Sequence, residues 1–280
     1  MANLIEVPVF ADVVNQKLNR ALKIVTLSTD YTTEVGDITL MGTEAHFPKL
    51  NRVVNMAKVT TNGTELTAGT VSLADTVAPI TMYAGNAVIY DRDVAAVKGS
   101  LIDRMAEQFA DECAVVMDDA LTATIRSETT KKSALASATA VTETELYNAY
   151  ALFGDSVNVS DFAGIAISSH LLPSFYAMPS FVDATKTVTM AGNGIVQDNV
   201  IGYWLGIPVI LDNSLYNTTT KEAQVVFVKK GALGHIMQKQ PTIEPERQAT
   251  FLRTAIVASE MFATKVMDTD GIVLCSKTIA

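Results

Sequence analysis

The chain has 280 residues, of which 49% are hydrophobic and 18% are charged, and its 21 basic and 30 acidic side chains give a net charge of −9. This apolar content is sufficient for a folded core and excludes an intrinsically disordered chain, which is poor in apolar residues and rich in charge. The isoelectric point of about 4.8 argues against a nucleic-acid reader that works through a strongly basic surface.

Targeting and membrane signals are absent from the sequence. The longest stretch without Asp, Glu, Lys or Arg covers residues 162–182, but it contains His170, Pro173 and Pro179, so we expect no membrane span. The N-terminus has no basic region followed by an apolar one, and no secretory signal is expected. Cys113 and Cys275 make no disulfide framework and favour a reducing compartment.

The N-terminal third is predicted to form an arm and a long β-hairpin. Residues 1–36 contain a short apolar extended piece and then a weakly amphipathic helical pattern, which together indicate an arm. Residues 37–80 read as β-structure, with the strongest turn signal of the chain at Asn62-Gly63. Their second half is rich in Thr, Ala and Gly, and such a ribbon buries little surface alone. It is either a surface hairpin or an arm that is stable only against another subunit.

A long helix is predicted over residues 91–126. Apolar residues recur there at spacings of three and four, and Asp91 or Asp93 is suited to the helix start. Four acidic residues share the opposite side of this helix: Asp103, Glu107, Asp111 and Asp118. This acidic strip is either a solvated face or a docking strip for a basic partner segment.

The second half of the chain is predicted to hold a compact domain followed by strands. Residues 127–140 are small and polar and indicate a linker. A capping box at Thr142–Glu145 then begins a helix, and alternating strand and helix signals continue to residue 229. Residues 231–280 read mostly as strands.

Catalytic motifs are sparse. The histidines at positions 46, 170 and 235 have no metal-ligand spacing, Ser168-Ser169-His170 lies in no nucleophile elbow, and no phosphate-binding loop occurs. We therefore expect no enzyme, no cofactor and no metal. A soluble α+β enzyme with an unrecognised site in residues 129–229 stays as an alternative of a different class.

The order of these parts resembles that of tailed-bacteriophage major capsid proteins of the Hong Kong 97 type, whose fold encapsulins share. Two segments add to the resemblance: Gly202-Tyr-Trp-Leu-Gly-Ile-Pro-Val-Ile-Leu-Asp-Asn213, and the run from Pro245 to Val273. The resemblance implies an α+β fold with an N-terminal arm (1–36), an extended E-loop hairpin (37–80), a peripheral domain (81–128 and 230–280) that includes the spine helix 91–126, and an axial domain (129–229).

The same resemblance implies the function. A protein of this type assembles into hexamers and pentamers of an icosahedral shell that encloses double-stranded DNA without reading its sequence, with scaffolding, portal and decoration proteins as partners. It is assembled in the host cytoplasm and resides in the virion capsid. No coiled-coil prefix precedes the arm, so we expect a separate scaffolding protein or none. An encapsulin-like compartment shell is the nearer alternative.

Charges suggest how neighbouring subunits meet. We expect Lys49, Arg52 and Lys58 of one subunit to lie near the acidic strip of another. Single exposed ion pairs contribute only about 0–1 kcal/mol, but many repeated copies set the register of an assembly. Some relatives cross-link a lysine of this loop to an asparagine, but no matching Asn or Glu is identifiable here, and we expect no cross-link.

Overall fold

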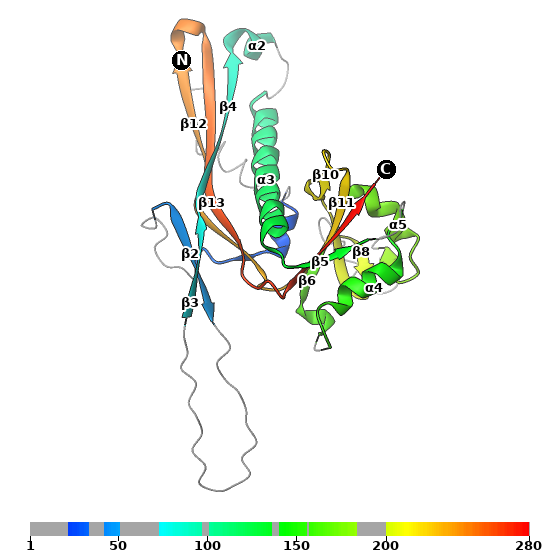
Figure 1. The fold of residues 1–280 in the computed structure, drawn as a ribbon. Coiled ribbons are helices and arrows are strands. Elements are labelled where there is room, and N and C mark those ends of the chain that lie inside the picture. Colours follow the sequence, from blue (N-terminus) through cyan, green and yellow to red (C-terminus); the bar gives the residue numbers. More distant parts are fainter. Residues whose placement is uncertain are drawn as a thin grey trace, which may run out of the picture.

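The computed structural model describes residues 22–33, 42–50, 73–96, 101–135, 140–155, 157–183 and 200–279. Within these ranges the chain forms a four-stranded sheet, an eight-stranded sheet and a two-stranded ribbon, together with one long helix and several short ones. Figure 1 shows that the four-stranded sheet is long and narrow, with the long helix running beside it, and that the eight-stranded sheet lies to one side of the lower end of that helix.

The four-stranded sheet is built around one long hairpin. Its strand order is β1-β12-β13-β4, and the strands span Thr29–Asp30 (β1), Leu233–Gln248 (β12), Arg253–Val266 (β13) and Thr81–Tyr90 (β4). A single 3-10 turn, η6 (Ala249–Phe251), joins β12 to β13 at the hairpin tip. The pair β1–β12 is parallel and the other pairs are antiparallel, so the N-terminal segment is tied to a strand about two hundred residues later in the chain.

The predicted long helix is present as two helices. They are α2 (Asp91–Ala96) and α3 (Leu101–Glu128), and residues 97–100 between them lie outside the described ranges. The start at Asp91 agrees with the prediction, and the end lies two residues beyond it. At about 1.5 Å per residue, the 28 residues of α3 extend about 42 Å.

The eight-stranded sheet forms the second half of the molecule. Its path is β5-β14-β11-β6-β9-β8-β7, and β10 pairs with β11 beside it. The strands span Lys131–Ala134 (β5), Phe162–Ile167 (β6), Phe181–Asp183 (β7), Val200–Trp204 (β8), Ile207–Leu211 (β9), Tyr216–Asn217 (β10), Glu222–Lys229 (β11) and Ile272–Thr278 (β14). Helices α4 (Glu143–Ala151) and α5 (Leu172–Tyr176) pack on one face through Leu146, Ala149 and Phe175, which share a core with Trp204 and Phe227.

The capping box predicted in this half is confirmed. Thr142 and Glu145 form the capping box: the Glu145 amide donates to the Thr142 hydroxyl oxygen, and the Thr142 amide donates to the Glu145 carboxylate at 2.8 Å. The uncharged stretch 162–182 is divided among β6, η4 (Ser169–Leu171), α5 and β7. Among the described residues, no helix combines the length and apolar character that crossing a membrane requires.

The assignment of residues 230–280 to one domain needs correction. Strands β12 and β13 belong to the four-stranded sheet, but β14 lies between β5 and β11 in the eight-stranded sheet. The reason is visible in the side chains, because Ile272, Val273, Leu274 and Cys275 are buried on both faces of their strand. Such a continuous apolar run is suited to the centre of a sheet that is covered on both sides.

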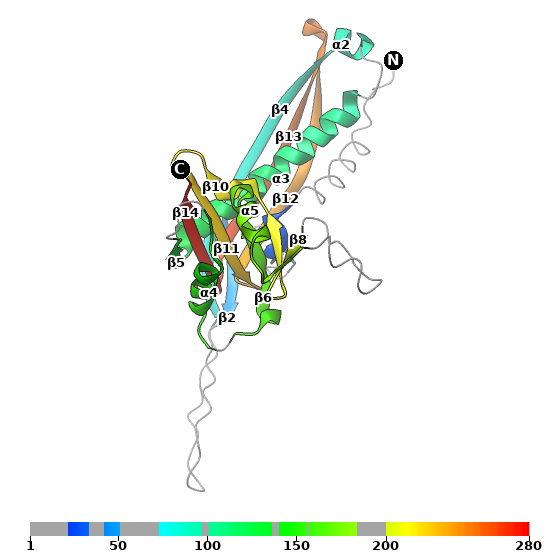
Figure 2. The same ribbon diagram turned by 90° about the vertical axis from the view of Figure 1, so that its right-hand side faces the viewer.

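Helix α3 holds the two sheets together. Its first half packs on the four-stranded sheet, where Met105, Phe109 and Ala110 meet Ile89 and Ile256. Its second half packs through Leu121 and Ile125 into a core with strands of both sheets and with η1 (Ile24–Leu27). Figure 2 shows α3 passing between the long strands and the second sheet. The two sheets therefore share one helix as a common core element.

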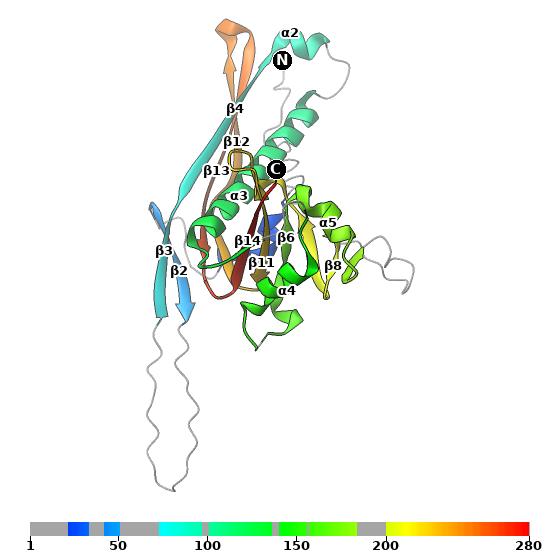
Figure 3. The same cartoon turned by 45° about the vertical axis from the view of Figure 1, so that its right-hand side comes forward.

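The base of the predicted hairpin is firmly packed. Strands β2 (Glu44–Leu50) and β3 (Leu73–Pro79) pair in antiparallel register from Glu44–Pro79 to Leu50–Leu73. Ala45, Phe47 and Ala78 are buried in a cluster with β12 and β13. Figure 3 shows this pair beside the lower end of β4. The turn predicted at Asn62-Gly63 lies outside the described residues.

Truncating Leu121 tests the role of α3 as the shared core element. Leu121 is fully buried, so Leu121→Ala should lower the free energy of unfolding by about 2–5 kcal/mol, the range for large core truncations. Val115 lies on the same helix and is 52% exposed, so Val115→Ala should change stability by less than about 1 kcal/mol. Chemical denaturation of unassembled subunits measures both, and equal effects would contradict the packing described here.

Candidate assembly surface

Two adjacent apolar side chains are exposed at the tip of the β12–β13 hairpin. Phe251 and Leu252 are each 64% exposed, and Leu252 has a left-handed backbone with φ of 47°. Asp91, the first residue of α2, holds the tip in place. Its amide donates to the Leu252 carbonyl at 3.0 Å, and its carboxylate accepts two hydrogen bonds of 2.6 Å from Arg247. The Arg247 guanidinium also holds the pKa of Asp91 below its usual value. The tip is thus a positioned apolar surface.

Strand β4 is an open edge of the four-stranded sheet. Among the described strands it pairs only with β13, and its ten residues, Thr81–Tyr90, include no charged side chain. Met82, Val88 and Tyr90 are exposed large apolar residues on it. Free strand edges usually carry charge, proline or a bulge that prevents pairing with another chain. An uncharged, apolar edge of this length is therefore suited to a contact with another subunit.

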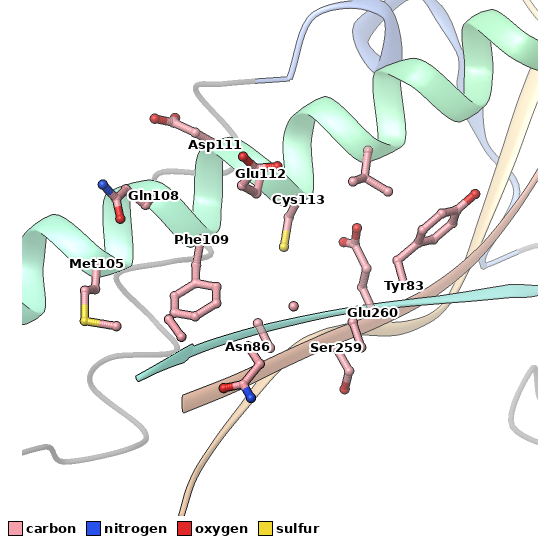
Figure 4. A pocket seen from close by; sticks show the side chains of 15 residues that line it. Tyr83, Asn86, Met105, Gln108, Phe109, Asp111, Glu112, Cys113, Ser259 and Glu260 are labelled. Carbon is pink, nitrogen blue, oxygen red and sulfur yellow. The ribbon is translucent and has the colours of Figure 1, made fainter. Parts of the chain in front are cut away.

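A groove lies between α3 and the strands β4 and β13. Its volume is about 610 Å³, and its walls include Tyr83, Asn86, Phe109, Cys113 and Glu260. Figure 4 shows Glu260 and Cys113 pointing toward each other across the space between sheet and helix, with Tyr83 beside them. Asp111 and Glu112 of α3 are exposed at the same groove. The groove therefore combines apolar walls with acidic groups.

The predicted acidic strip is only partly an exposed surface. Glu107 and Asp111 are exposed on α3, while Asp103 lies in α3 with a side chain outside the described set. Asp118 is 4% exposed, so its place in an exposed strip is wrong. Helical periodicity correctly predicts that the four residues share one face of the helix. It carries no information about η1, which covers this face at position 118.

Asp118 instead binds the N-terminal segment. Its carboxylate accepts hydrogen bonds of 3.1 Å from the amides of Lys23 and Val25, which anchors η1 on α3. Burial, together with the neighbouring carboxylate of Asp212, raises the pKa of Asp118 to about 7. Asp212 is held by Ser214, whose amide and hydroxyl both donate to it. No local sequence pattern indicates this contact, because it depends on a chain segment about ninety residues away.

The basic half of the predicted contact lies mostly outside the described residues. Lys49 is in β2, opposite Ala74 of β3, but its side chain is not among those described. Arg52 and Lys58 lie wholly outside the described ranges. Their pairing with the acidic residues of another copy therefore stays a prediction.

The histidines have packing contacts in the described structure. His235 is buried, its Nδ1 lies 2.7 Å from the Ser28 hydroxyl, and burial lowers its pKa. His170 stacks on Tyr216 with 4.0 Å between ring centroids. Ser168, which neighbours His170, is fully buried, so its hydroxyl is closed to a substrate. No group of three or more His, Cys, Asp or Glu side chains in the described ranges is arranged to hold a metal ion.

Comparison with solved structures identifies the fold. The match to a chain from Mycobacterium phage Che8 spans 92% of this chain and 92% of the phage chain, with a TM-score of 0.61 and 18% sequence identity. The capsid of Ralstonia phage GP4 matches with a TM-score of 0.66 over 91% of this chain and 87% of its own, at 9% identity. The chain has the Hong Kong 97-type capsid fold.

The same fold occurs in a second kind of particle. A virus-like particle from Pyrococcus furiosus matches with a TM-score of 0.57 and 12% identity, covering 97% of this chain and 100% of its own. No family model and no curated protein matches the sequence. The fold is thus recognised from structure at identities where sequence comparison finds nothing.

The raised pKa of Asp118 predicts a pH-dependent stability difference. Its folded pKa of about 7 lies above the ordinary value of about 3.9, so the folded state holds an extra proton between those values. The contribution of the Asp118 carboxyl group to the free energy of unfolding is therefore fully present below about pH 4. It is lost as the pH rises to about 7. The free energy of unfolding of the wild type, measured relative to that of Asp118→Asn, should therefore fall between pH 4 and pH 7. Above pH 7 this difference should stay constant. A flat difference in urea denaturation would contradict the shifted pKa.

Proposed function

We propose that this chain is a major capsid protein that assembles into hexamers and pentamers of an icosahedral shell around double-stranded DNA. The observation that carries the proposal is the match of nearly the whole chain to capsid chains, including those of Ralstonia phage GP4 and cyanophage P-SCSP1u. The exposed apolar tip at Phe251 and Leu252 and the open edge of β4 support it, because shell subunits require several different contact surfaces.

The charge of the chain is compatible with this role. A container need not bind DNA tightly, and a net charge of −9 limits salt-dependent adhesion to the packaged phosphates. Scaffolding, portal and decoration proteins are proposed as partners by analogy with such shells. On this proposal the subunits assemble in the host cytoplasm and reside in the virion capsid, and the role is structural rather than enzymatic.

An encapsulin-like shell is the second candidate. The match to the virus-like particle from Pyrococcus furiosus favours it, since the covered fractions of both chains are high. Electron microscopy of purified particles tests the main proposal, because a closed icosahedral shell containing nuclease-protected DNA is expected. A closed shell that encloses a protein cargo instead would support the second candidate. A monomer under all assembly conditions would refute both.

Charge reversal tests the proposed contact between subunits. With Asp118 buried, the residues of the predicted acidic strip that we propose as partners are Glu107 and Asp111, which are exposed, and Asp103. Lys49→Glu combined with Arg52→Glu should slow assembly severalfold and change its salt dependence, without lowering subunit stability. Light scattering and thermal unfolding measure the two effects.

A matched control is available on the other sheet. Lys132 and Lys221 are exposed there, and reversing both to Glu makes the same change in net charge. This control should assemble nearly as the wild type does. Equal slowing in both double variants would indicate a general charge effect and contradict the specific pairing.

The hairpin tip gives a second test of assembly. Phe251→Ser with Leu252→Asn removes two exposed apolar side chains, and asparagine tolerates the left-handed backbone at position 252 better than leucine does. Subunit stability should stay the same or rise slightly. The subunit concentration needed for assembly should rise about tenfold or more if the tip is a buried apolar contact in the shell. Assembly at the wild-type concentration would show that the tip stays exposed.

A further inference from the structure

A short segment near the N-terminus joins both sheets to the helix between them. Residues 23–31, which we call the strap, begin with η1 on α3 and end with β1, which pairs with β12 of the four-stranded sheet. Figure 1 shows η1, in blue, beside the lower end of α3. Leu27 is 4% exposed and packs on β6 of the eight-stranded sheet, where a Cβ atom at Gly164 would lie only 2.7 Å from its side chain. The strap is therefore seated at Leu27, with one anchor on each side.

The first anchor is a buried carboxylate on α3. Asp118 is 4% exposed and accepts hydrogen bonds of 3.1 Å from the amides of Lys23 and Val25. Burial, followed by the negative charge of Asp212, raises the pKa of Asp118 to about 7, and the amide hydrogen bonds lower it only in part. Attachment of this end of the strap thus covers a carboxyl group whose charged form is costly to bury.

The charged groups around Asp118 are mostly acidic. Asp212 follows β9, and Asp119 is the next residue of α3, while Lys23 is the basic residue of the strap. Arg126, two turns further along α3, donates instead to a side chain of β11 at 2.8 Å. The carboxylates of Asp118 and Asp212 thus make this anchor sensitive to pH, because two neighbouring like charges disfavour full ionisation.

The second anchor is a buried histidine on β12. His235 is 7% exposed, and its Nδ1 atom lies 2.7 Å from the Ser28 hydroxyl. That hydroxyl donates its hydrogen to the Val25 carbonyl at 2.7 Å, so Nδ1 must carry the hydrogen that the Ser28 oxygen accepts. In the neutral ring, Nε2 therefore carries no hydrogen. Burial lowers the pKa of His235, which disfavours a proton on Nε2.

The charges that face His235 oppose this effect only in part. Asp30 of β1 raises the pKa of the histidine, but its side chain is 57% exposed and its Oδ1 atom lies 4.0 Å from Nε2. On β13, the residue opposite His235 is the uncharged Thr264, and the next residue, Lys265, is ion-paired with Glu128 of α3. Burial is thus the larger effect at this anchor.

The two anchors consequently respond to pH in opposite directions. When the first end detaches, the pKa of Asp118 returns to about 3.9, so the closed end holds an extra proton between about pH 4 and 7 and weakens as the pH rises. When the second end detaches, the pKa of His235 returns to about 6.5. This pKa is lower while the end is closed, so the closed end holds fewer protons and weakens as the pH falls below about 6.5.

We propose that the strap is a pH-dependent clasp whose two ends loosen at opposite sides of the pH range, the α3 end as the pH rises and the β12 end as it falls, while Leu27 stays seated between them. The α3 end controls how firmly the chain before residue 23 is attached, and the β12 end controls the connection that leads toward β2. This inference goes beyond the proposed function, because it concerns the single subunit and does not depend on assembly.

Hydrogen exchange at single-residue resolution tests the clasp in unassembled subunits between pH 5 and 8. The amides of Lys23 and Val25 report the α3 end, and the Tyr31 amide, which donates to the His235 carbonyl at 3.0 Å, reports the β12 end. After correction for intrinsic exchange rates, protection of the first two amides should fall by up to about tenfold per pH unit from pH 5 to 7. Protection of the Tyr31 amide should instead fall as the pH drops below about 6.5.

Neutral replacements should abolish the two responses separately. Asp118→Asn keeps an acceptor oxygen, and it should make protection at Lys23 and Val25 independent of pH while the response at Tyr31 remains. His235→Asn keeps a donor near the position of Nδ1, and it should remove only the response at Tyr31.

Matched control variants are available for both anchors. Asp111→Asn removes an exposed carboxylate of α3, and His170→Asn removes an exposed histidine that follows β6. Both variants should show the two responses of the wild type.

Two further variants leave both anchors in place and keep the test valid if an anchor variant fails to fold. Asp212→Asn removes a charge that raises the pKa of Asp118, so the response at the α3 end should move to lower pH. Asp30→Asn removes the charge that raises the pKa of His235, so the response at Tyr31 should also move to lower pH.

Three outcomes would overturn the clasp. Protection that changes in the same direction at both ends would show that the strap moves as one body. Protection equal to that of the Val226 amide in β11 at every pH would show that the strap opens only when the whole subunit unfolds. Responses that persist in both Asp118→Asn and His235→Asn would show that other groups titrate. A chain that never assembles, by contrast, would refute only the proposed function.

Discussion

The burial of one helix against two sheets is the constraint on which this molecule depends. The apolar side of α3 changes partners along its length, from the four-stranded sheet at Phe109 to the core between the sheets at Leu121. Among the described residues, α3 contributes buried side chains to the cores of both sheets on that side. The relative placement of the two sheets, the position of the N-terminal segment and the groove at Glu260 all follow from this packing.

The helix also determines which charges are available to partners. Where α3 borders solvent or the groove, its acidic residues are exposed, as at Asp111. Where η1 covers it, Asp118 becomes an internal anchor for backbone amides. Residues with the same chemistry and the same helical face thus have two roles, an external one near the start of α3 and an internal one near its end.

Much of this architecture could be predicted from local sequence patterns. The strand at Phe162–Ile167, the capping box at Thr142 and the long helix each depend on residues close together in the chain. The burial of Asp118, the placement of β14 in the second sheet and the orientation of Glu260 toward α3 could not be predicted in this way. Each depends on segments far apart in the sequence, and periodicity identifies a face without identifying what covers it. The alternation along β13 does place Glu260 on the face opposite Ser259, but only the tertiary structure shows that α3 lies there.

The position of β14 has a consequence for synthesis. This strand is made after β5 and β11, yet it lies between them and supplies core residues to both faces of the sheet. A nascent or truncated chain that ends before residue 272 lacks this internal strand, so β5 has no neighbour and β11 has an open side. Closure of the sheet must therefore await synthesis of β14, since non-local strand pairing requires both strands to be present. The second sheet thereby closes only in a chain that extends through β14.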